Sequence, residues 1–214
     1  MPLQAISIPA KTGKSPQGVF VALHGWGANA QDLAALAPML NLPAYQMLFP
    51  NAPFPHPYSA EGRVWYNFPE TFAFEASAAF ATQPDLVESR YLLTEWLRSL
   101  PDSTGVPLEQ TVLAGFSQGG AMTLDVGLNL PLAGLLVLSG YLHAPAQVGS
   151  MAPSSVVMVH GRQDQVVPIR EAERSRNQLL ALNIPVSYHE LPGGHEISPR
   201  VLEIVQNFTE EIRL

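Results

Sequence analysis

The sequence of 214 residues contains no cysteine, so disulfide bonds, thiolate metal sites and a cysteine nucleophile are all excluded. This absence makes the cytoplasm the expected compartment. Basic residues are few as well. Eleven lysines and arginines against eighteen acidic residues give a net charge of −7 at pH 7. Such a chain has no basic surface for nucleic acid or anionic membranes, and we expect no nucleic-acid partner.

Long hydrophobic runs are also missing. No apolar stretch reaches the ~18 residues that a membrane-spanning helix needs. The N-terminus lacks the basic start and the apolar core of a signal peptide. We therefore expect neither integral membrane association nor a secretory leader.

Apolar residues, in contrast, make up 47% of the chain and are grouped in a regular alternation. Strands are predicted at 3–9, 19–23, 45–49, 111–114, 132–138, 156–159 and 186–191, and helices at about 29–40, 85–100, 121–128, 170–182 and 198–212. The almost continuous apolar run at 132–138 is typical of a parallel strand covered on both faces. Strands that alternate with helices predict a single α/β domain over residues 1–214, with one mostly parallel sheet and helices on both faces.

Residues 51–83 interrupt this alternation. Prolines at positions 53, 55, 57 and 69 exclude long regular elements, and eight aromatic residues are concentrated here. An irregular segment of ~30 residues in a compact domain is typically a functional lid or a binding loop. We expect it to cover the strand ends and to line a substrate pocket with Trp65, Phe72 and Phe74. The alternative is a loop that only packs onto itself through its aromatic side chains.

The strongest chemical signal is Gly-Phe-Ser-Gln-Gly at residues 115–119. It lies between the predicted strand 111–114 and the predicted helix 121–128. A serine on so sharp a turn exposes its hydroxyl, and the flanking glycines avoid Cβ clashes. The helix N-terminus directs free N–H groups toward an oxyanion formed beside Ser117. The alternative is a glycine-rich turn with an N-capping serine, so other residues must decide.

Two further predicted strands end at residues that could assist a serine. Asp164 follows the strand 156–159, and His195 follows the strand 186–191. Reactive groups gather at the carboxyl ends of parallel strands, and the order Ser, Asp, His is that of α/β-hydrolases. A neutral imidazole can take the serine proton, while the carboxylate fixes its tautomer and stabilises the imidazolium.

Asp125 is a rival candidate for the acid, because it lies on the helix that follows Ser117. Eight residues of helix separate it from the serine, which is about two turns. We therefore expect Asp164 to be the acid.

An oxyanion needs two N–H donors. The backbone of Gln118, directly after the serine, supplies one of them. The loop after the strand 19–23 supplies the other, most simply at Trp26, since glycines on both sides let its backbone approach a substrate.

The remaining histidines do not suggest a cofactor. His24 and His160 begin turn motifs, where we expect them to hold loops through hydrogen bonds. His56, His143 and His189 share no metal-ligand spacing. Neither a metal nor another cofactor is expected.

Several motifs occur in a fixed order between residues 19 and 197. They are Leu23-His24-Gly25-Trp26-Gly27, Arg63-Val64-Trp65-Tyr66, Gly115-Phe116-Ser117-Gln118-Gly119-Gly120, Leu138-Ser139-Gly140, His160-Gly161-x-x-Asp164-x-x-Val167-Pro168 and Gly194-His195. Together they resemble the acyl-protein thioesterase/carboxylesterase family, also called the phospholipase/carboxylesterase family. The resemblance implies an α/β-hydrolase fold and the triad Ser117, Asp164 and His195, with the N–H groups of Trp26 and Gln118 as the oxyanion hole.

By the same resemblance, the activity is that of a serine hydrolase. It would cleave carboxylic esters or thioesters of short to medium acyl chains through an acyl-enzyme. The leaving group stays open between an alcohol, a thiol, a lysophospholipid and an acylated protein. Trp26 stands where the family more often has an aliphatic residue, so its indole is expected to reshape the acyl pocket.

Two alternatives accompany this reading. Within enzymes, the alternative is a hydrolase of lactones or activated esters. Outside enzymes, it is a hydrolase-fold protein that only binds a ligand, although a pure binder has no need of all three triad groups.

Overall fold

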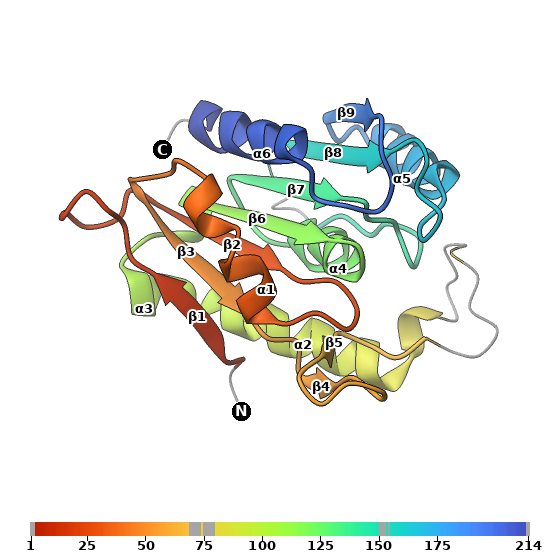
Figure 1. Cartoon of the computed structure of the whole chain (residues 1–214), viewed down its shortest axis with the longest axis horizontal. Coiled ribbons are helices and arrows are strands. Elements are labelled where there is room, and N and C mark those ends of the chain that lie inside the picture. Colours follow the sequence, from red (N-terminus) through yellow and green to blue (C-terminus); the bar gives the residue numbers. More distant parts are fainter. Residues whose placement is uncertain (1–2, 69–73, 75–79, 150–152, 154, 213–214) are drawn as a thin grey trace.

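A computed structural model describes residues 3–68, 74, 80–149, 153 and 155–212. Its main sheet has seven strands: β1 (Ala5–Ile8), β2 (Gly18–Leu23), β3 (Tyr45–Pro50), β6 (Thr111–Phe116), β7 (Gly134–Leu138), β8 (Val156–Gly161) and β9 (Val186–Leu191). Their order across the sheet is β1-β3-β2-β6-β7-β8-β9 (Figure 1). β1 runs antiparallel to β3, and every other neighbouring pair in this sheet is parallel.

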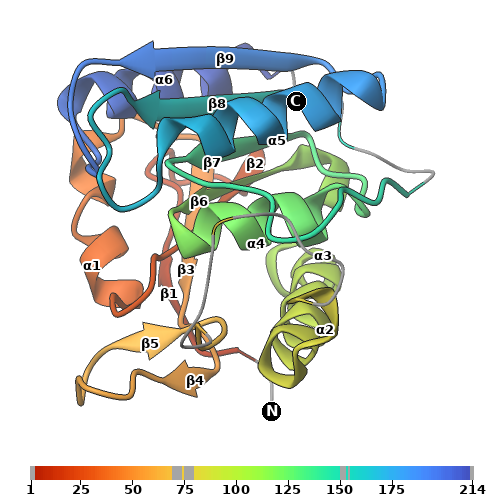
Figure 2. The same cartoon turned by 90° about the vertical axis from the view of Figure 1, so that its right-hand side faces the viewer.

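Helices cover both faces of the sheet (Figure 2). On one face lie α1 (Ala30–Ala34), the 3₁₀ turn η1 (Ala37–Met39) and α6 (Pro199–Glu211). On the other lie α2 (Pro84–Arg98), α3 (Leu100–Thr104), α4 (Gln118–Gly127) and α5 (Ile169–Ala181). Two short 3₁₀ turns, η2 (Phe80–Thr82) and η3 (Leu108–Gln110), precede α2 and β6. This arrangement confirms the predicted fold class. Among the residues that the structure describes, no helix has both the length and the apolar character needed to cross a membrane.

Burial explains why these strands form. Every residue of β2, β7 and β8 is buried, because helices pack on both sides of the middle of the sheet. The edge strand β9 is only partly buried. Apolar runs without alternation therefore mark the inner parallel strands.

Helix ends follow local signals. The Asn29 side chain accepts a hydrogen bond from the N–H of Asp32, whose carboxylate accepts one from the N–H of Asn29, so the predicted cap of α1 is confirmed. The single helix expected over 29–40 is wrong, because α1 ends at Ala34 and η1 follows it. Pro38 lies inside η1 and has no N–H for a continuous α-helix.

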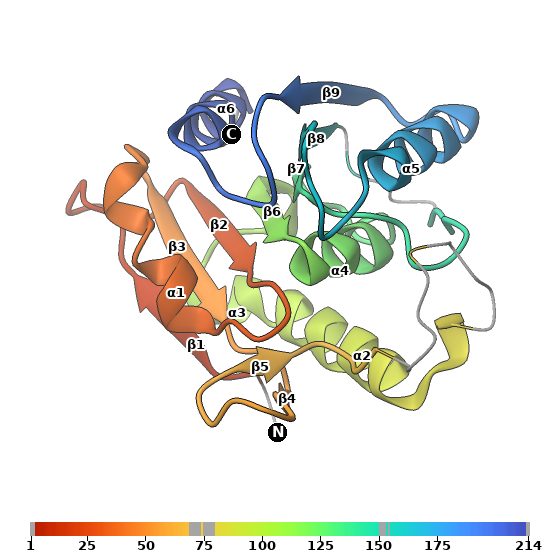
Figure 3. The same cartoon turned by 45° about the vertical axis from the view of Figure 1, so that its right-hand side comes forward.

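Besides η2, the described part of the segment 51–83 contains a small sheet. β4 (Phe54–Pro55) and β5 (Arg63–Val64) form a two-stranded antiparallel ladder (Figure 3). β5 also pairs with the loop after β2, since the N–H of Gly27 donates to Arg63 O at 2.9 Å and the N–H of Arg63 donates to Ala28 O at 2.9 Å. This segment is therefore attached to the carboxyl edge of the sheet. Phe72, one of the expected pocket residues, lies outside the described residues.

Candidate active site

Ser117 occupies a strained turn between β6 and α4. Its φ is 56° and its ψ is −117°, a left-handed conformation that residues with a Cβ rarely adopt. The turn is possible because of its glycines: a Cβ at Gly115 would overlap Gly119 O, and a Cβ at Gly119 would overlap Leu23 O. The N–H of Ser117 donates to Leu138 O at 2.8 Å, which fixes the turn against β7.

Asp164 and His195 form a hydrogen-bonded pair. The Nδ1 of His195 lies 2.7 Å from Asp164 Oδ2, and the Asp164 carboxylate is fully buried. Its Oδ1 accepts from the N–H groups of Val166 at 2.9 Å and Val167 at 2.8 Å. With Nδ1 donating to the carboxylate, Nε2 of His195 is free to act as a base.

The loops that carry Asp164 and His195 are joined directly by hydrogen bonds. The N–H of Gln163 donates to Gly193 O at 2.9 Å, and the N–H of Gly193 donates to the Gln163 side chain at 2.7 Å. A third bond runs from the N–H of Arg162 to Leu191 O at 2.9 Å. The relative position of Asp164 and His195 is therefore set by main-chain contacts between neighbouring loops.

The pair lies beside the serine turn. The ring of Phe116, the residue before Ser117, has its centroid 4.7 Å from that of His195. A Cβ placed on Gly25 would lie 3.3 Å from the Cβ of Ser117, so the loop after β2 passes directly over the serine. The fold thus brings the three predicted strand ends and this loop to one place.

His160 supports the acid loop, as predicted. Its Nε2–H donates to Val167 O at 2.8 Å and lies 3.3 Å from Asp164 Oδ2. Burial lowers the pKa of His160, while the Val167 carbonyl and Asp164 oppose that shift. The ring therefore stays neutral and links both ends of the turn that holds Asp164.

His24 has a similar role in the loop that follows β2. Its Nδ1 donates to Gly25 O at 2.8 Å, and its Nε2 accepts from the N–H of Ala52 at 3.0 Å. These partners require a neutral ring with the proton on Nδ1, and burial lowers the pKa of His24 accordingly. The expectation that His24 holds a loop is confirmed.

The lowered pKa values of His24 and His160 predict how the stability of the fold depends on pH. Their folded-state pKa values lie below the ordinary 6.5, so the unfolded chain binds more protons than the folded chain once the pH falls below about that value. Their contribution to stability is complete above pH 6.5 and is lost as the pH falls toward the folded-state pKa values. We expect Tm, followed by circular dichroism, to decrease from about pH 7 to about pH 5, and to decrease less steeply in His24→Asn. Equal slopes for the two proteins would contradict this assignment.

Trp65 does not take the place expected for it. It is fully buried, and its indole N–H donates to His24 O at 3.0 Å. A ring without exposed surface cannot contact an acyl chain in this conformation. Trp65 therefore lies behind the loop that follows β2, where it supports the backbone of that loop.

The aromatic surface beside the serine is formed by other residues. Phe68 and Phe74 pack against a small cluster of Ala121, Tyr141 and Val167. Phe74 lies edge-on to Tyr141, with ring centroids 5.0 Å apart. Because Ala121 is one turn into α4 and Val167 is three residues after Asp164, this cluster borders the loops that carry Ser117 and Asp164.

Trp26 completes this surface on the side of the loop that follows β2. Its indole is 38% exposed, and its ring centroid lies 6.1 Å from that of Phe68 and 4.0 Å from that of His56. Phe68 and Val167 were not assigned to the site from the sequence. The available signals were the position of Phe68 two residues after Arg63-Val64-Trp65-Tyr66 and the position of Val167 inside the Asp164 motif.

A family model described as Phospholipase/Carboxylesterase matches residues 5–213, which is nearly the whole chain. The chain belongs to the phospholipase/carboxylesterase family. Its fold is therefore that of the α/β-hydrolases, and the predicted resemblance is confirmed.

Similarity to individual proteins extends over the full length. Acyl-protein thioesterase 1 of Mycosarcoma maydis is 26% identical, covering 98% of this chain and 97% of its own. The crystal structure of esterase PE8 has a TM-score of 0.89 and 30% identity, covering 100% of both chains. A phospholipase/carboxylesterase from Dyadobacter fermentans has a TM-score of 0.75 and 25% identity, covering 98% of this chain and 97% of its own. This member of the phospholipase/carboxylesterase family is thus similar to a thioesterase and to esterases over its full length.

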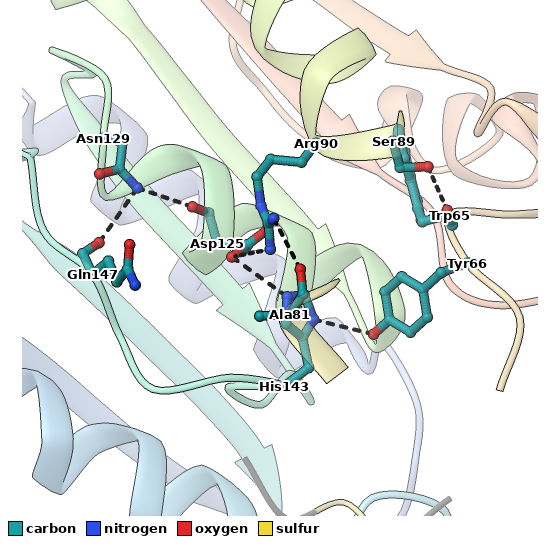
Figure 4. Close-up of polar contacts among 9 residues, drawn as sticks. All are labelled: Trp65, Tyr66, Ala81, Ser89, Arg90, Asp125, Asn129, His143 and Gln147. Carbon is teal, nitrogen blue, oxygen red and sulfur yellow. Dashed lines mark hydrogen bonds and ion pairs between the residues drawn. The ribbon is translucent and has the colours of Figure 1, made fainter. Parts of the chain in front are cut away.

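Asp125, the alternative candidate for the acid in this phospholipase/carboxylesterase chain, is paired with residues other than His195 (Figure 4). Its carboxylate lies 2.6 Å from Arg90 Nε and 3.5 Å from His143 Nε2. Burial tends to raise the pKa of Asp125, but His143 and Arg90 together hold it below its ordinary value. His195 contacts Asp164 instead. Within the described part of the chain, no group of three His, Cys, Asp or Glu side chains is arranged to hold a metal ion.

Proposed function

We propose that this protein is a serine hydrolase that cleaves carboxylic esters and thioesters through an acyl-enzyme on Ser117. The observation that carries the proposal is the strained Ser117 turn beside the hydrogen-bonded pair of His195 and Asp164. A positive φ at a non-glycine residue costs free energy, and residues strained in this way cluster at active sites. Membership in a family of carboxylesterases and thioesterases supports the same chemistry.

In the first half of the reaction, Ser117 Oγ attacks the carbonyl carbon of the substrate while His195 Nε2 removes its proton. The carbonyl oxygen becomes an oxyanion, which accepts hydrogen bonds from the N–H groups of Trp26 and Gln118. The buried Asp164 stabilises the imidazolium of His195. The intermediate then collapses, the alcohol or thiol leaves with the proton from His195, and the acyl group remains on Ser117.

In the second half, water replaces the leaving group. His195 removes a proton from the water, whose oxygen attacks the acyl-enzyme carbonyl and regenerates the oxyanion in the same hole. Collapse of this intermediate breaks the bond to Ser117 Oγ, and the proton returns from His195 to the serine. The products are a carboxylic acid and the free enzyme, and no cofactor takes part.

The acyl chain would lie against the aromatic surface of Trp26, Phe68 and Phe74. These rings border the site on the side of the segment 51–83, which supports the proposal that this segment forms the acyl wall. An apolar wall excludes water and binds aliphatic chains without selecting the leaving group. Oxygen esters and thioesters of short to medium chains are therefore both proposed substrates. A thioesterase among the similar proteins makes acylated protein a candidate as well.

Labelling with a fluorophosphonate tests the proposal. Such a reagent phosphonylates an activated serine, and we expect one label per chain, located on Ser117 by mass spectrometry of peptides. No labelling would favour the alternative, a hydrolase-fold protein that only binds a ligand. A label on another serine would contradict the assignment of Ser117.

The proposed acyl wall leads to a prediction about how kcat/KM depends on the length of the acyl chain. Each methylene buried by the wall contributes about 0.8 kcal/mol, so kcat/KM should rise up to about fourfold per methylene until the wall is filled. Phe74→Ala, alone or with Phe68→Ala, should flatten this rise between acetyl and octanoyl p-nitrophenyl esters and leave acetyl hydrolysis nearly intact.

Tyr91→Ala is the matched control, because Tyr91 is an exposed aromatic residue on α2. Its profile of kcat/KM against chain length should follow that of the wild type. Equal losses for acetyl and octanoyl esters in the Phe74 variant would mean that this ring only supports the fold.

A further inference from the structure

The motif Arg63-Val64-Trp65-Tyr66 has no part in the proposed chemical steps, yet it lies between the two proposed oxyanion donors. On one side, Arg63 exchanges two main-chain hydrogen bonds with the loop that carries Trp26, at Gly27 and Ala28. In addition, the indole of Trp65 donates to His24 O in the same loop. Three hydrogen bonds thus attach this motif to the first donor loop.

On the other side, the motif is held by the side chain of Gln118. This side chain is fully buried, its Oε1 accepts from the N–H of Trp65 at 2.9 Å, and its Nε2 donates to Tyr66 O at 2.7 Å. The primary amide therefore satisfies one donor and one acceptor of the same backbone segment. Gln118 is also the residue whose main-chain N–H is the second proposed oxyanion donor.

Residues of α2 and of the loop after β7 also hold the motif in place (Figure 4). Ser89 Oγ donates to Trp65 O, so the polar backbone atoms of Trp65 are both occupied. The hydroxyl of Tyr66 lies 2.8 Å from that of Tyr141 and 3.3 Å from His143 Nδ1. Burial and the neighbouring Tyr141 raise the pKa of Tyr66 well above its ordinary value, so the hydroxyl stays neutral in this contact.

We propose that the Gln118 side chain is a positioning residue for the oxyanion hole, because through Trp65 and Tyr66 it fixes the separation between the N–H groups of Gln118 and Trp26. This inference rests on the proposed function. Two donors stabilise an oxyanion only when both point at the same atom, and a misplacement of about 1 Å can cost about 10²-fold in rate. Here the donors come from different loops, and the buried motif connects them by hydrogen bonds at both ends.

Gln118→Met tests the proposal, since the methionine side chain has about the length and volume of the glutamine side chain but forms neither hydrogen bond. We expect kcat to fall about 10- to 100-fold while KM stays within about twofold, because the lost interaction acts mainly on the transition state. The affinity for a trifluoromethyl ketone, which forms an oxyanion on the serine, should fall by the same factor as kcat. The shape of the pH–rate profile should not change, because the His195–Asp164 pair is untouched.

Two further variants separate positioning from loss of stability. Tyr45→Phe removes a buried hydrogen bond to Thr209 O at 2.8 Å on the far side of the protein, and should lower Tm without changing kcat. In Gln118→Glu, a neutral carboxyl group can accept from Trp65 and donate to Tyr66 as the amide does. Because burial favours the neutral acid, the ratio of its kcat to that of the wild type should rise as the pH is lowered from about 7.5 to about 5.5.

The outcomes are distinct when rates are expressed per serine titrated by the fluorophosphonate. A lower Tm for Gln118→Met with unchanged kcat would overturn the proposal and leave the side chain a structural role. A raised KM with unchanged kcat would overturn it too, because the motif would then position the substrate. Failure of the wild type to react at Ser117 would instead refute the proposed function.

Discussion

Ser117→Ala should lower kcat for ester hydrolysis by a factor on the order of 10⁶, the loss known for removal of the nucleophile from a serine protease triad. Without the hydroxyl no acyl-enzyme forms, and only the oxyanion hole and binding interactions remain. The fold should be retained, since alanine and serine both carry a Cβ and meet the same constraint at a φ of 56°. Measurements of kcat with p-nitrophenyl esters and of Tm by circular dichroism check both parts.

Ser139→Ala is the matched control. Ser139 also has a positive φ, 48°, is buried at the end of β7, and donates its N–H to Val159 O at 2.8 Å. It therefore repeats the backbone setting of Ser117 on the neighbouring strand and has no proposed chemical step. Its variant should lose less than about tenfold in kcat. Retention of more than about a tenth of the wild-type kcat in Ser117→Ala would refute the nucleophile.

Asp164→Asn should lower kcat by about 10⁴ near neutral pH. The asparagine amide can still accept hydrogen bonds from Val166 and Val167, so the loop should keep its shape. Its NH₂ group would, however, face Nδ1 of His195, which favours the tautomer with the proton on Nε2. That tautomer cannot take the proton of Ser117.

Asp125→Asn provides the comparison, because Asp125 is a half-buried carboxylate on α4 and is paired with Arg90. We expect it to lower Tm, since it weakens an ion pair that is partly shielded from water. Its effect on kcat should not approach that of Asp164→Asn. If the two effects were reversed, Asp125 would have to be considered as the acid.

Much of the fold could be predicted because buried strands have a recognisable apolar pattern in the sequence. β2, β7 and β8 are buried on both faces, and each contains an unbroken apolar run of at least four residues. The strand-to-helix turn at Ser117 was predictable for a related reason, since only glycines fit at positions 115 and 119. The predicted site residues at strand ends then followed from the parallel arrangement.

Other features could not be predicted because they depend on contacts between distant segments. In 51–83 neither helical nor strand periodicity indicates which aromatic rings are buried, so Trp65 was expected to line the acyl pocket although it is fully enclosed. The hydrogen bond from Trp65 to the Gln118 side chain joins residues 53 positions apart. No local pattern reveals that a glutamine in a catalytic motif also holds a remote backbone segment.

The hydrogen bonds between the loops 162–164 and 191–195 also affect how these loops move. Because Gln163 and Gly193 bind each other through main chain and side chain, the acid and the base are expected to move together as one rigid unit. Any fluctuation that separates the catalytic groups would then occur between this unit and the serine turn. In hydrogen–deuterium exchange, the amides of Arg162, Gln163 and Gly193 would become accessible through one shared opening event, with a single common free energy of opening.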